Sequence, residues 1–180
     1  KVMRIASAVR AQKDKPLLIL GNVGAASLVT EMLKNVPEAL ICTGEGEDML
    51  SYVVSFVLGE DILLKDIPNL AYDVGGRVGV TSLRPVEIKF TGRPSRDFID
   101  HTRESLGMSL SEVSRGCKYN CSFCSRAGFL GRGNRARRIK DVLEEVVELS
   151  QAGIRFINFV DDDFSQIDLG KIWEFADGLI

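Results

Sequence analysis

Three of the four cysteines in this 180-residue chain lie within eight positions, at Cys117, Cys121 and Cys124. A structural zinc site takes four ligands, and the only further ligands of this kind are Cys42 and His101, neither of them nearby in the sequence. An iron–sulfur cluster held by three thiolates keeps one iron open to another ligand. The C-x3-C-x2-C spacing therefore indicates a cluster with a vacant position where a substrate or cofactor binds.

The composition is that of a globular chain with a core of its own, because 45% of the residues are hydrophobic and 27% are charged. The formal net charge of −2 gives no electrostatic reason to expect a nucleic-acid partner. Apolar runs such as residues 17–20 are far shorter than the roughly 18 residues that span a bilayer, so no membrane partner is expected. Clustered cysteines favour a metal centre over a disulfide framework, and we expect a cytoplasmic protein.

Helix and strand signals alternate through residues 1–59. The predicted order is helix, strand, helix, strand, helix, at residues 2–9, 17–20, 26–33, 39–42 and 49–57. Glycine-containing turns follow both strands. This order is typical of an open parallel sheet and predicts half of a doubly wound α/β domain.

Residues 60–107 are predicted to be a linker that contains a β-hairpin, because Gly75 and Gly76 separate two short apolar runs. The alternation returns in residues 108–180. There we expect a strand at 108–113, the cysteine loop, a helix at 139–149 and a strand at 154–160 covered on both faces. A last helix follows Asp168, its expected N-cap. The chain starts without an initiator methionine and stops within a helical pattern, so we expect a piece of a longer protein.

The C-x3-C-x2-C loop, placed directly after a strand in a βα unit, resembles the radical S-adenosylmethionine (SAM) superfamily. The resemblance implies that Cys117, Cys121 and Cys124 ligate a [4Fe–4S] cluster, whose open iron chelates the amino and carboxylate groups of SAM. Reductive cleavage of SAM then starts radical chemistry in that family. Phe123 matches the aromatic residue that packs against the adenine.

A second part of the SAM site is implied at Asp161, Asp162 and Asp163, which follow the predicted strand at 154–160. The family has a glycine-glycine-glutamate segment here that receives the methionine amino group. This chain is acidic and glycine-free instead, and a carboxylate near an ammonium group is physically sensible. Simple N-capping or solvation is the alternative interpretation of the three aspartates.

Residues 1–59 and the linker are similar to the later part of the cobalamin-binding domain that precedes many radical SAM domains. The resemblance implies a cobalamin site whose nucleotide side is lined by Gly21, Asn22, Gly24, Thr43, Gly44, Glu45 and Gly46. Two features depart from that class: Gly-Asn stands where paired glycines are common, and residues 1–180 lack the Asp-x-His-x-x-Gly motif of the lower axial ligand. The implied architecture is α/β: the C-terminal half of a Rossmann-like domain (1–59), the linker (60–107), and the first βα units of a partial TIM barrel (108–180).

Three function hypotheses remain open. The first is a cobalamin-dependent radical SAM enzyme for methyl transfer or carbon-skeleton modification, with a small-molecule or peptide substrate and a low-potential electron donor such as ferredoxin or flavodoxin. The second is a methylthiotransferase on RNA or protein, a family with three further N-terminal cysteines, whereas residues 1–110 hold only Cys42. The third is a non-catalytic module stapled by a metal. Iron with sulfide indicates an enzyme, and zinc indicates the module.

Three other features have simpler interpretations. Cys42 is expected to be a small buried hydrophobic residue, and His101 a surface residue. Residues 128–140 carry five basic side chains without an acid, for which solvation is the expected role.

Overall fold

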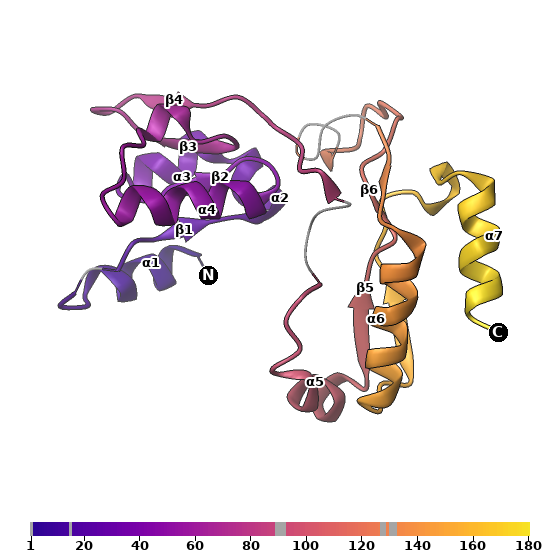
Figure 1. The fold of residues 1–180 in the computed structure, drawn as a ribbon. Coiled ribbons are helices and arrows are strands. Elements are labelled where there is room, and N and C mark those ends of the chain that lie inside the picture. The colour runs from indigo at the N-terminus through magenta and orange to yellow at the C-terminus, as the bar shows by residue number, and fades with distance from the viewer. Residues whose placement is uncertain (1, 15, 89–92, 127–128, 130–132) are drawn as a thin grey trace. The chain divides into compact units, whose positions relative to one another are not determined.

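A computed structural model describes residues 2–14, 16–88, 93–126, 129 and 133–180 (Figure 1). Its internal contacts divide the chain into two compact units. Unit 1 comprises Lys1–Val86 and Ser122–Gly131, and unit 2 comprises Glu87–Cys121 and Arg132–Ile180. Both units combine helices with strands, so the predicted α/β class is confirmed.

Unit 1 contains a four-stranded mixed sheet in the order β1-β2-β3-β4. The strands are β1 (Ile19–Leu20), β2 (Leu40–Cys42), β3 (Leu70–Asp73) and β4 (Val78–Val80). β1 and β2 pair in parallel, whereas β3 pairs antiparallel with both β2 and β4. The predicted hairpin is present, with φ angles of 60° at Gly75 and 85° at Gly76 in its turn. Its two strands extend the sheet that β1 and β2 begin.

Helices cover both faces of this sheet (Figure 1). They are α1 (Val2–Arg10), α2 (Asn22–Ser27), α3 (Val29–Asn35) and α4 (Gly46–Val57), with a 3-10 turn, η1, at Leu64–Asp66. Leu40 packs with Met49 and Val53 of α4, whereas Ile41 packs with Leu33 of α3. Neighbouring strand residues point to opposite faces, so the two helices lie on opposite sides of β2. The single helix predicted at 26–33 was wrong: Leu28 leaves the helical conformation between α2 and α3.

Unit 2 is built around β5 (Met108–Ser111) and β8 (Phe156–Phe159), which pair in parallel with Met108 opposite Phe156. A second, antiparallel pair joins β6 (Ser114–Arg115) to β7 (Arg135–Ala136). The helices are α5 (Ile99–Leu106), α6 (Ile139–Gln151) and α7 (Leu169–Gly178), and a 3-10 turn, η4, spans Phe164–Gln166. The predicted strand–loop–helix–strand–helix order from residue 108 is therefore present.

The core of unit 2 lies between β8 and helices α6 and α7. Val113, Val142 and Phe175 are buried there together, and the rings of Phe159 and Phe175 meet edge to face at 5.3 Å. The expectation that β8 is covered on both faces was wrong for the described residues, because Phe156 remains 71% exposed. Phe175 anchors α7 on the core, and this orientation leaves Trp173 67% exposed.

The ends of the helices follow the sequence signals. Asp168 accepts a hydrogen bond from the Gly170 N–H at 3.0 Å and caps α7 as predicted. Gly153, with φ of 81°, stands just past the end of α6.

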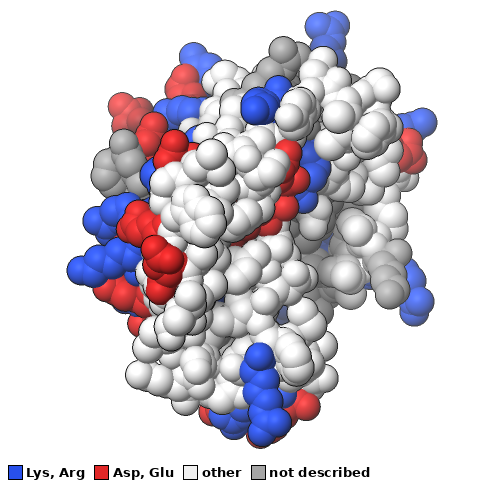
Figure 2. All heavy atoms as spheres, turned by 90° about the vertical axis from the view of Figure 1, so that its right-hand side faces the viewer, with Lys and Arg blue, Asp and Glu red and all other residues white. Residues whose placement is uncertain are grey.

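The face of the molecule on the side of α7 has a wide area without charged side chains, and acidic and basic groups are interspersed toward its edges (Figure 2). None of the described helices is long and apolar enough to cross a membrane.

Candidate functional site

The cysteine loop follows β6 and ends at β7, and both of these strands belong to unit 2. Ser114 pairs with Ala136, and Arg115 with Arg135, so the two ends of the loop are held together. Gly116 follows at once with a left-handed φ of 84°, and a Cβ there would lie 2.2 Å from the Gly133 carbonyl oxygen. Only glycine fits this turn, which delivers the chain to Cys117.

Asp161 binds the backbone at the start of this loop. One carboxylate oxygen accepts hydrogen bonds from the Ser114 N–H at 2.5 Å and the Ser114 hydroxyl at 2.7 Å. The other oxygen accepts from the Val113 N–H at 3.1 Å. Asp161 follows β8, and β5 precedes Val113, so this carboxylate connects the exits of the two parallel strands.

The next two aspartates have different partners. Asp162 accepts a hydrogen bond from the Gly116 N–H at 2.9 Å, one residue before the first cysteine. Asp163 caps η4 by accepting from the Ser165 N–H at 3.1 Å and the Ser165 hydroxyl at 2.6 Å. Hydrogen bonds from Ser165 and then Gln166 hold the pKa of Asp163 below its usual value. All three carboxylates thus have protein partners, and their predicted role toward SAM stays a prediction.

Gln166 connects η4 directly to the cysteine loop. Its side-chain carbonyl accepts a hydrogen bond from the Lys118 N–H at 2.8 Å. Its amide nitrogen lies 3.1 Å from the Cys117 Sγ and 2.7 Å from an oxygen of Asp163. Sequence reasoning missed this residue, because its two loop contacts span 48 and 49 positions and leave no local pattern.

The three cysteines of the loop are free thiols. Cys117 is half-buried, whereas Cys121 and Cys124 are exposed. Within the described part of the chain, no three His, Cys, Asp or Glu side chains are grouped closely enough to hold a metal ion. Cys124 falls in unit 1 and the other two in unit 2. The ligand assignment stays a prediction, and three soft, accessible thiols are the donor set that an iron–sulfur cluster requires.

The predicted adenine contact, Phe123, is 89% exposed, so its ring is accessible to a ligand. The sequence also predicted that Cys42 is buried and that His101 lies at the surface, and both predictions are confirmed. Cys42 is buried, and this burial raises the pKa of its thiol. His101 lies exposed on α5.

The predicted cobalamin-facing residues of unit 1 follow β1 and β2, whose parallel pairing places both turns at one sheet edge. A Cβ on Gly21 would lie 3.8 Å from the Cys42 Cβ, and one on Gly46 would lie 3.7 Å from the Cys42 Sγ. Asn22 adopts a left-handed φ of 73°, and Gly24 has open space around it in α2. The turns thus lie close together, as a shared binding site requires, and the cobalamin role of these residues stays a prediction.

The turn after β2, which contains Thr43, is attached to the segment that follows β4. A Cβ on Gly44 would lie 2.9 Å from the side chain of Asn69, which is fully buried, so a larger residue at this position would displace it. Glu45 is buried, and its carboxylate accepts a hydrogen bond from the Val86 N–H at 2.7 Å.

Asn69 completes this attachment. It is fully buried, and its amide donates to the carbonyls of Glu45 and Arg84 at 2.9 and 2.8 Å. Its side-chain oxygen accepts from the Arg84 N–H at 2.6 Å. The Asn69 carbonyl also accepts from the Thr43 N–H at 2.8 Å. Every hydrogen-bonding group of the Asn69 side chain thus binds the backbone, at Glu45 in the turn after β2 and at Arg84 in the segment after β4.

A buried ion-pair network lies next to the cysteine loop in unit 2. Glu145 of α6 is 1% exposed and pairs with Arg96 and with Arg137, the latter at 2.8 Å. Arg137 also donates to the Glu112 carbonyl at 2.9 Å. The expectation that the basic stretch 128–140 is solvated was therefore wrong at Arg137.

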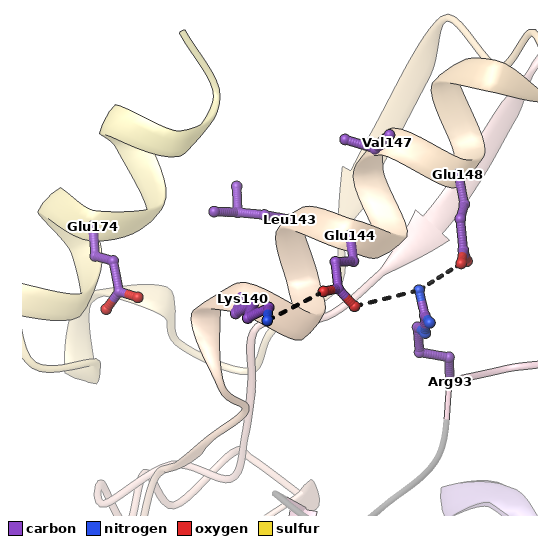
Figure 3. Close-up of a pocket in the computed structure, with 7 residues that line it drawn as sticks. All are labelled: Arg93, Lys140, Leu143, Glu144, Val147, Glu148 and Glu174. Atoms are coloured by element: carbon purple, nitrogen blue, oxygen red, sulfur yellow. Dashed lines mark hydrogen bonds and ion pairs between the residues drawn. The ribbon is translucent and has the colours of Figure 1, made fainter.

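A cavity of about 580 Å³ opens along α6 and α7 (Figure 3). Its lining residues are Arg93, Lys140, Leu143, Glu144, Val147, Glu148 and Glu174. Arg93 extends toward α6 and pairs with Glu148 at 2.5 Å and with Glu144 at 3.8 Å. None of these residues belongs to the predicted SAM or cluster set.

Comparison with curated proteins identifies relatives of this chain. It is 30% identical over 131 residues to an uncharacterized methyltransferase of Pyrococcus horikoshii, covering 69% of this chain and 28% of that protein. It is 27% identical over 183 residues to the tRNA-2-methylthio-N(6)-dimethylallyladenosine synthase of Neisseria meningitidis, covering 98% of this chain and 37% of that protein. The chain thus spans about a third of the length of these relatives. No protein-family model matches it.

Solved structures share the fold. The cobalamin-dependent SAM radical enzyme OxsB, bound to aqua-cobalamin and SAM, matches with a TM-score of 0.85 and 24% identity over 99% of this chain and 26% of OxsB. The radical SAM methyltransferase TsrM of Kitasatospora setae, bound to tryptophan substrate and a SAM analogue, matches with a TM-score of 0.78 and 18% identity. That match covers 98% of this chain and 35% of TsrM. The solved structures that share the fold of this chain are therefore radical SAM enzymes, and its cysteine loop has the C-x3-C-x2-C spacing.

Proposed function

We propose that this protein is a radical SAM enzyme that holds a [4Fe–4S] cluster through Cys117, Cys121 and Cys124. The observation that carries the proposal is the attachment of the loop backbone to the exits of two parallel strands, through Asp161 and Gln166, while its thiols stay free. Ligand sites in barrels of parallel strands lie at this end of the strands. When bound, the cluster would supply the electron that cleaves SAM into methionine and a 5′-deoxyadenosyl radical.

The residues of this chain would bind and orient the reactants. Phe123 would pack its exposed ring against the adenine. Asp161 and Asp162 would hold the backbone from Val113 to Gly116 in place, so that Cys117 keeps a fixed direction. Asp163, whose low pKa keeps it charged, would supply a negative charge near the ammonium group of SAM.

The reaction that we propose is cobalamin-dependent methyl transfer or carbon-skeleton modification of a small molecule or peptide. The likeness to OxsB and TsrM, together with the relative named as a methyltransferase, supports this choice. Gly21, Asn22, Gly24 and the turn from Thr43 to Gly46 would face the cobalamin. A low-potential ferredoxin or flavodoxin in the cytoplasm would supply the electron.

A methylthiotransferase is the second candidate, favoured by the similarity to the Neisseria enzyme over 98% of this chain. Within this chain only Cys42 remains to serve a second cluster, and it is buried. An iron content near four atoms per chain fits the first proposal. A content near eight would support the methylthiotransferase.

The deciding experiment is anaerobic reconstitution with iron and sulfide, followed by electron paramagnetic resonance (EPR) of the reduced protein with and without SAM. We expect a four-iron signal that changes when SAM is added, because SAM binds at the open iron. Zinc bound in place of a cluster would make the loop a structural staple and would overturn the proposal.

A further inference from the structure

Gln166 approaches a predicted cluster ligand with a hydrogen-bond donor. Its amide nitrogen lies 3.1 Å from the Cys117 Sγ, and the interaction is partly buried. It comes from η4, outside the loop that contains the cysteines. Neither the family resemblance nor the comparisons assign this residue a role.

Its partners fix which end of the amide faces the sulfur. The Lys118 N–H can only donate, so it requires the Gln166 carbonyl, at 2.8 Å. An Asp163 oxygen lies 2.7 Å from the amide nitrogen and, as a charged carboxylate, can only accept. The reversed amide would oppose donor to donor and acceptor to acceptor. One N–H therefore points to Asp163, and the other is directed at Cys117.

Asp163 keeps this arrangement in place. Its carboxylate is held by the hydroxyl and N–H of Ser165, at 2.6 and 3.1 Å. The Asp163 carboxylate thus fixes the orientation of the Gln166 amide, and with it the direction of the second N–H toward Cys117. A donor positioned by a carboxylate in this way is typical of the groups that surround metal ligands.

We propose that Gln166 is a positioning residue that donates an N–H···S hydrogen bond to the Cys117 thiolate and thereby raises the reduction potential of the cluster. The inference rests on the proposed function, because it requires that Cys117 ligate a cluster. Reduction adds negative charge to the cluster and its sulfur ligands, and a hydrogen bond to sulfur stabilises the reduced form more than the oxidised form. The bond would ease transfer of the first electron into the cluster.

The first test detects the hydrogen bond itself. The chain has three glutamines, Gln12, Gln151 and Gln166, so protein grown with side-chain ¹⁵N-glutamine carries few labels. After reconstitution and reduction, pulsed EPR should show a ¹⁵N coupling to the cluster. The coupling should disappear in Gln166→Leu and persist in Gln151→Leu, which removes an exposed glutamine at the end of α6. A coupling unchanged in Gln166→Leu would overturn the proposal.

The second test separates tuning of the potential from support of the loop. Gln166→Glu keeps an oxygen for the Lys118 N–H but loses the donor to sulfur, whereas Gln166→Leu loses both. In redox titrations monitored by EPR, the midpoint potential of the cluster should be about 59 mV more negative in both variants. For a one-electron couple, this shift is a roughly tenfold lower equilibrium constant for reduction. Gln151→Leu should not shift it.

The outcomes distinguish this inference from the proposed function. If Gln166→Leu shifts the potential and Gln166→Glu does not, Gln166 only supports the loop and the inference fails. If neither variant shifts it while the cluster forms normally, the inference also fails and the proposed function stands. If the wild-type protein assembles no cluster, the proposed function fails. This inference then fails as well, because it requires a cluster at Cys117.

Discussion

The Asp161 carboxylate accepts hydrogen bonds from both the backbone N–H and the hydroxyl of Ser114, at 2.5 and 2.7 Å. The two residues are 47 positions apart in the sequence and meet where β5 and β8 end side by side. The contact fixes the strand from which the cysteine loop departs. The acidic segment after β8 is therefore part of the framework of the loop, in addition to its proposed role toward SAM.

Replacement of Asp161 by Asn should destabilise unit 2 by about 1 to 3 kcal/mol, because an amide nitrogen would face backbone N–H donors and one acceptor would be lost. Urea unfolding of the apoprotein measures this change. Asp177→Asn, at an exposed position of α7, is the matched control and should stay within about 0.5 kcal/mol of the wild type. Equal stability of the two variants would show that Asp161 does not support the loop.

Replacement of Cys117, Cys121 and Cys124 together by Ala should abolish the brown chromophore and the bound iron and sulfide, since the thiolates are the predicted ligands. Cys42→Ala should retain all three, because Cys42 is buried in unit 1 and its raised pKa keeps the thiol protonated. Iron and sulfide analysis after reconstitution measures both. Full iron content in the triple variant would refute the ligand assignment.

Replacement of Phe123 by Ala should weaken SAM binding about tenfold and leave the cluster intact, because it removes only the ring predicted to face the adenine. Phe98→Ala removes a ring of similar exposure from the other unit and should leave the affinity unchanged. Titration of the SAM-dependent EPR change gives the two affinities. Equal affinities would remove the adenine-packing role.

Replacement of Asn69 by Ala should cost unit 1 about 2 to 3 kcal/mol, because buried backbone groups of Glu45 and Arg84 would lose their partners. Asn69→Asp should be similarly harmful, since its charged oxygens would face those carbonyls. Urea unfolding provides the comparison, with Asn35→Ala at an exposed end of α3 as the control. A harmless Asn69→Asp would contradict the hydrogen-bond arrangement.

The pKa of Asp163 should rise toward its ordinary value in Ser165→Ala, because the Ser165 hydroxyl makes the largest contribution to lowering it. A lowered folded-state pKa means that the charged carboxylate stabilises the fold above the unfolded pKa of about 3.9. This contribution is lost as the pH falls through the lower folded value. Carbon-13 NMR titration of the apoprotein should show a lowered pKa of Asp163 in the wild type and a higher one in Ser165→Ala. The resonance that is missing in Asp163→Asn identifies the Asp163 carboxylate. An unchanged pKa in Ser165→Ala would contradict the assigned cause.

The sequence predicted the features that depend on near neighbours. The cysteine spacing identified the loop, and apolar periodicity located α4 and α6, because one helix face repeats every 3.6 residues. Gly75 and Gly76 indicated the hairpin, since its turn requires positive φ angles. Periodicity did not reveal that Leu28 interrupts the second predicted helix.

The sequence by itself thus determined which donor atoms the loop offers, because three thiols within eight positions are a local property. Only the tertiary structure decided which distant side chains contact the loop and the residues that flank it. Gln166 reaches Cys117, Asp161 reaches Ser114, and Arg137 becomes buried against Glu145. The first two contacts join positions 49 and 47 residues apart, which the parallel pairing of β5 with β8 brings together. A side chain's partner across such a pairing depends on strand register and packing, and no spacing within the sequence encodes it.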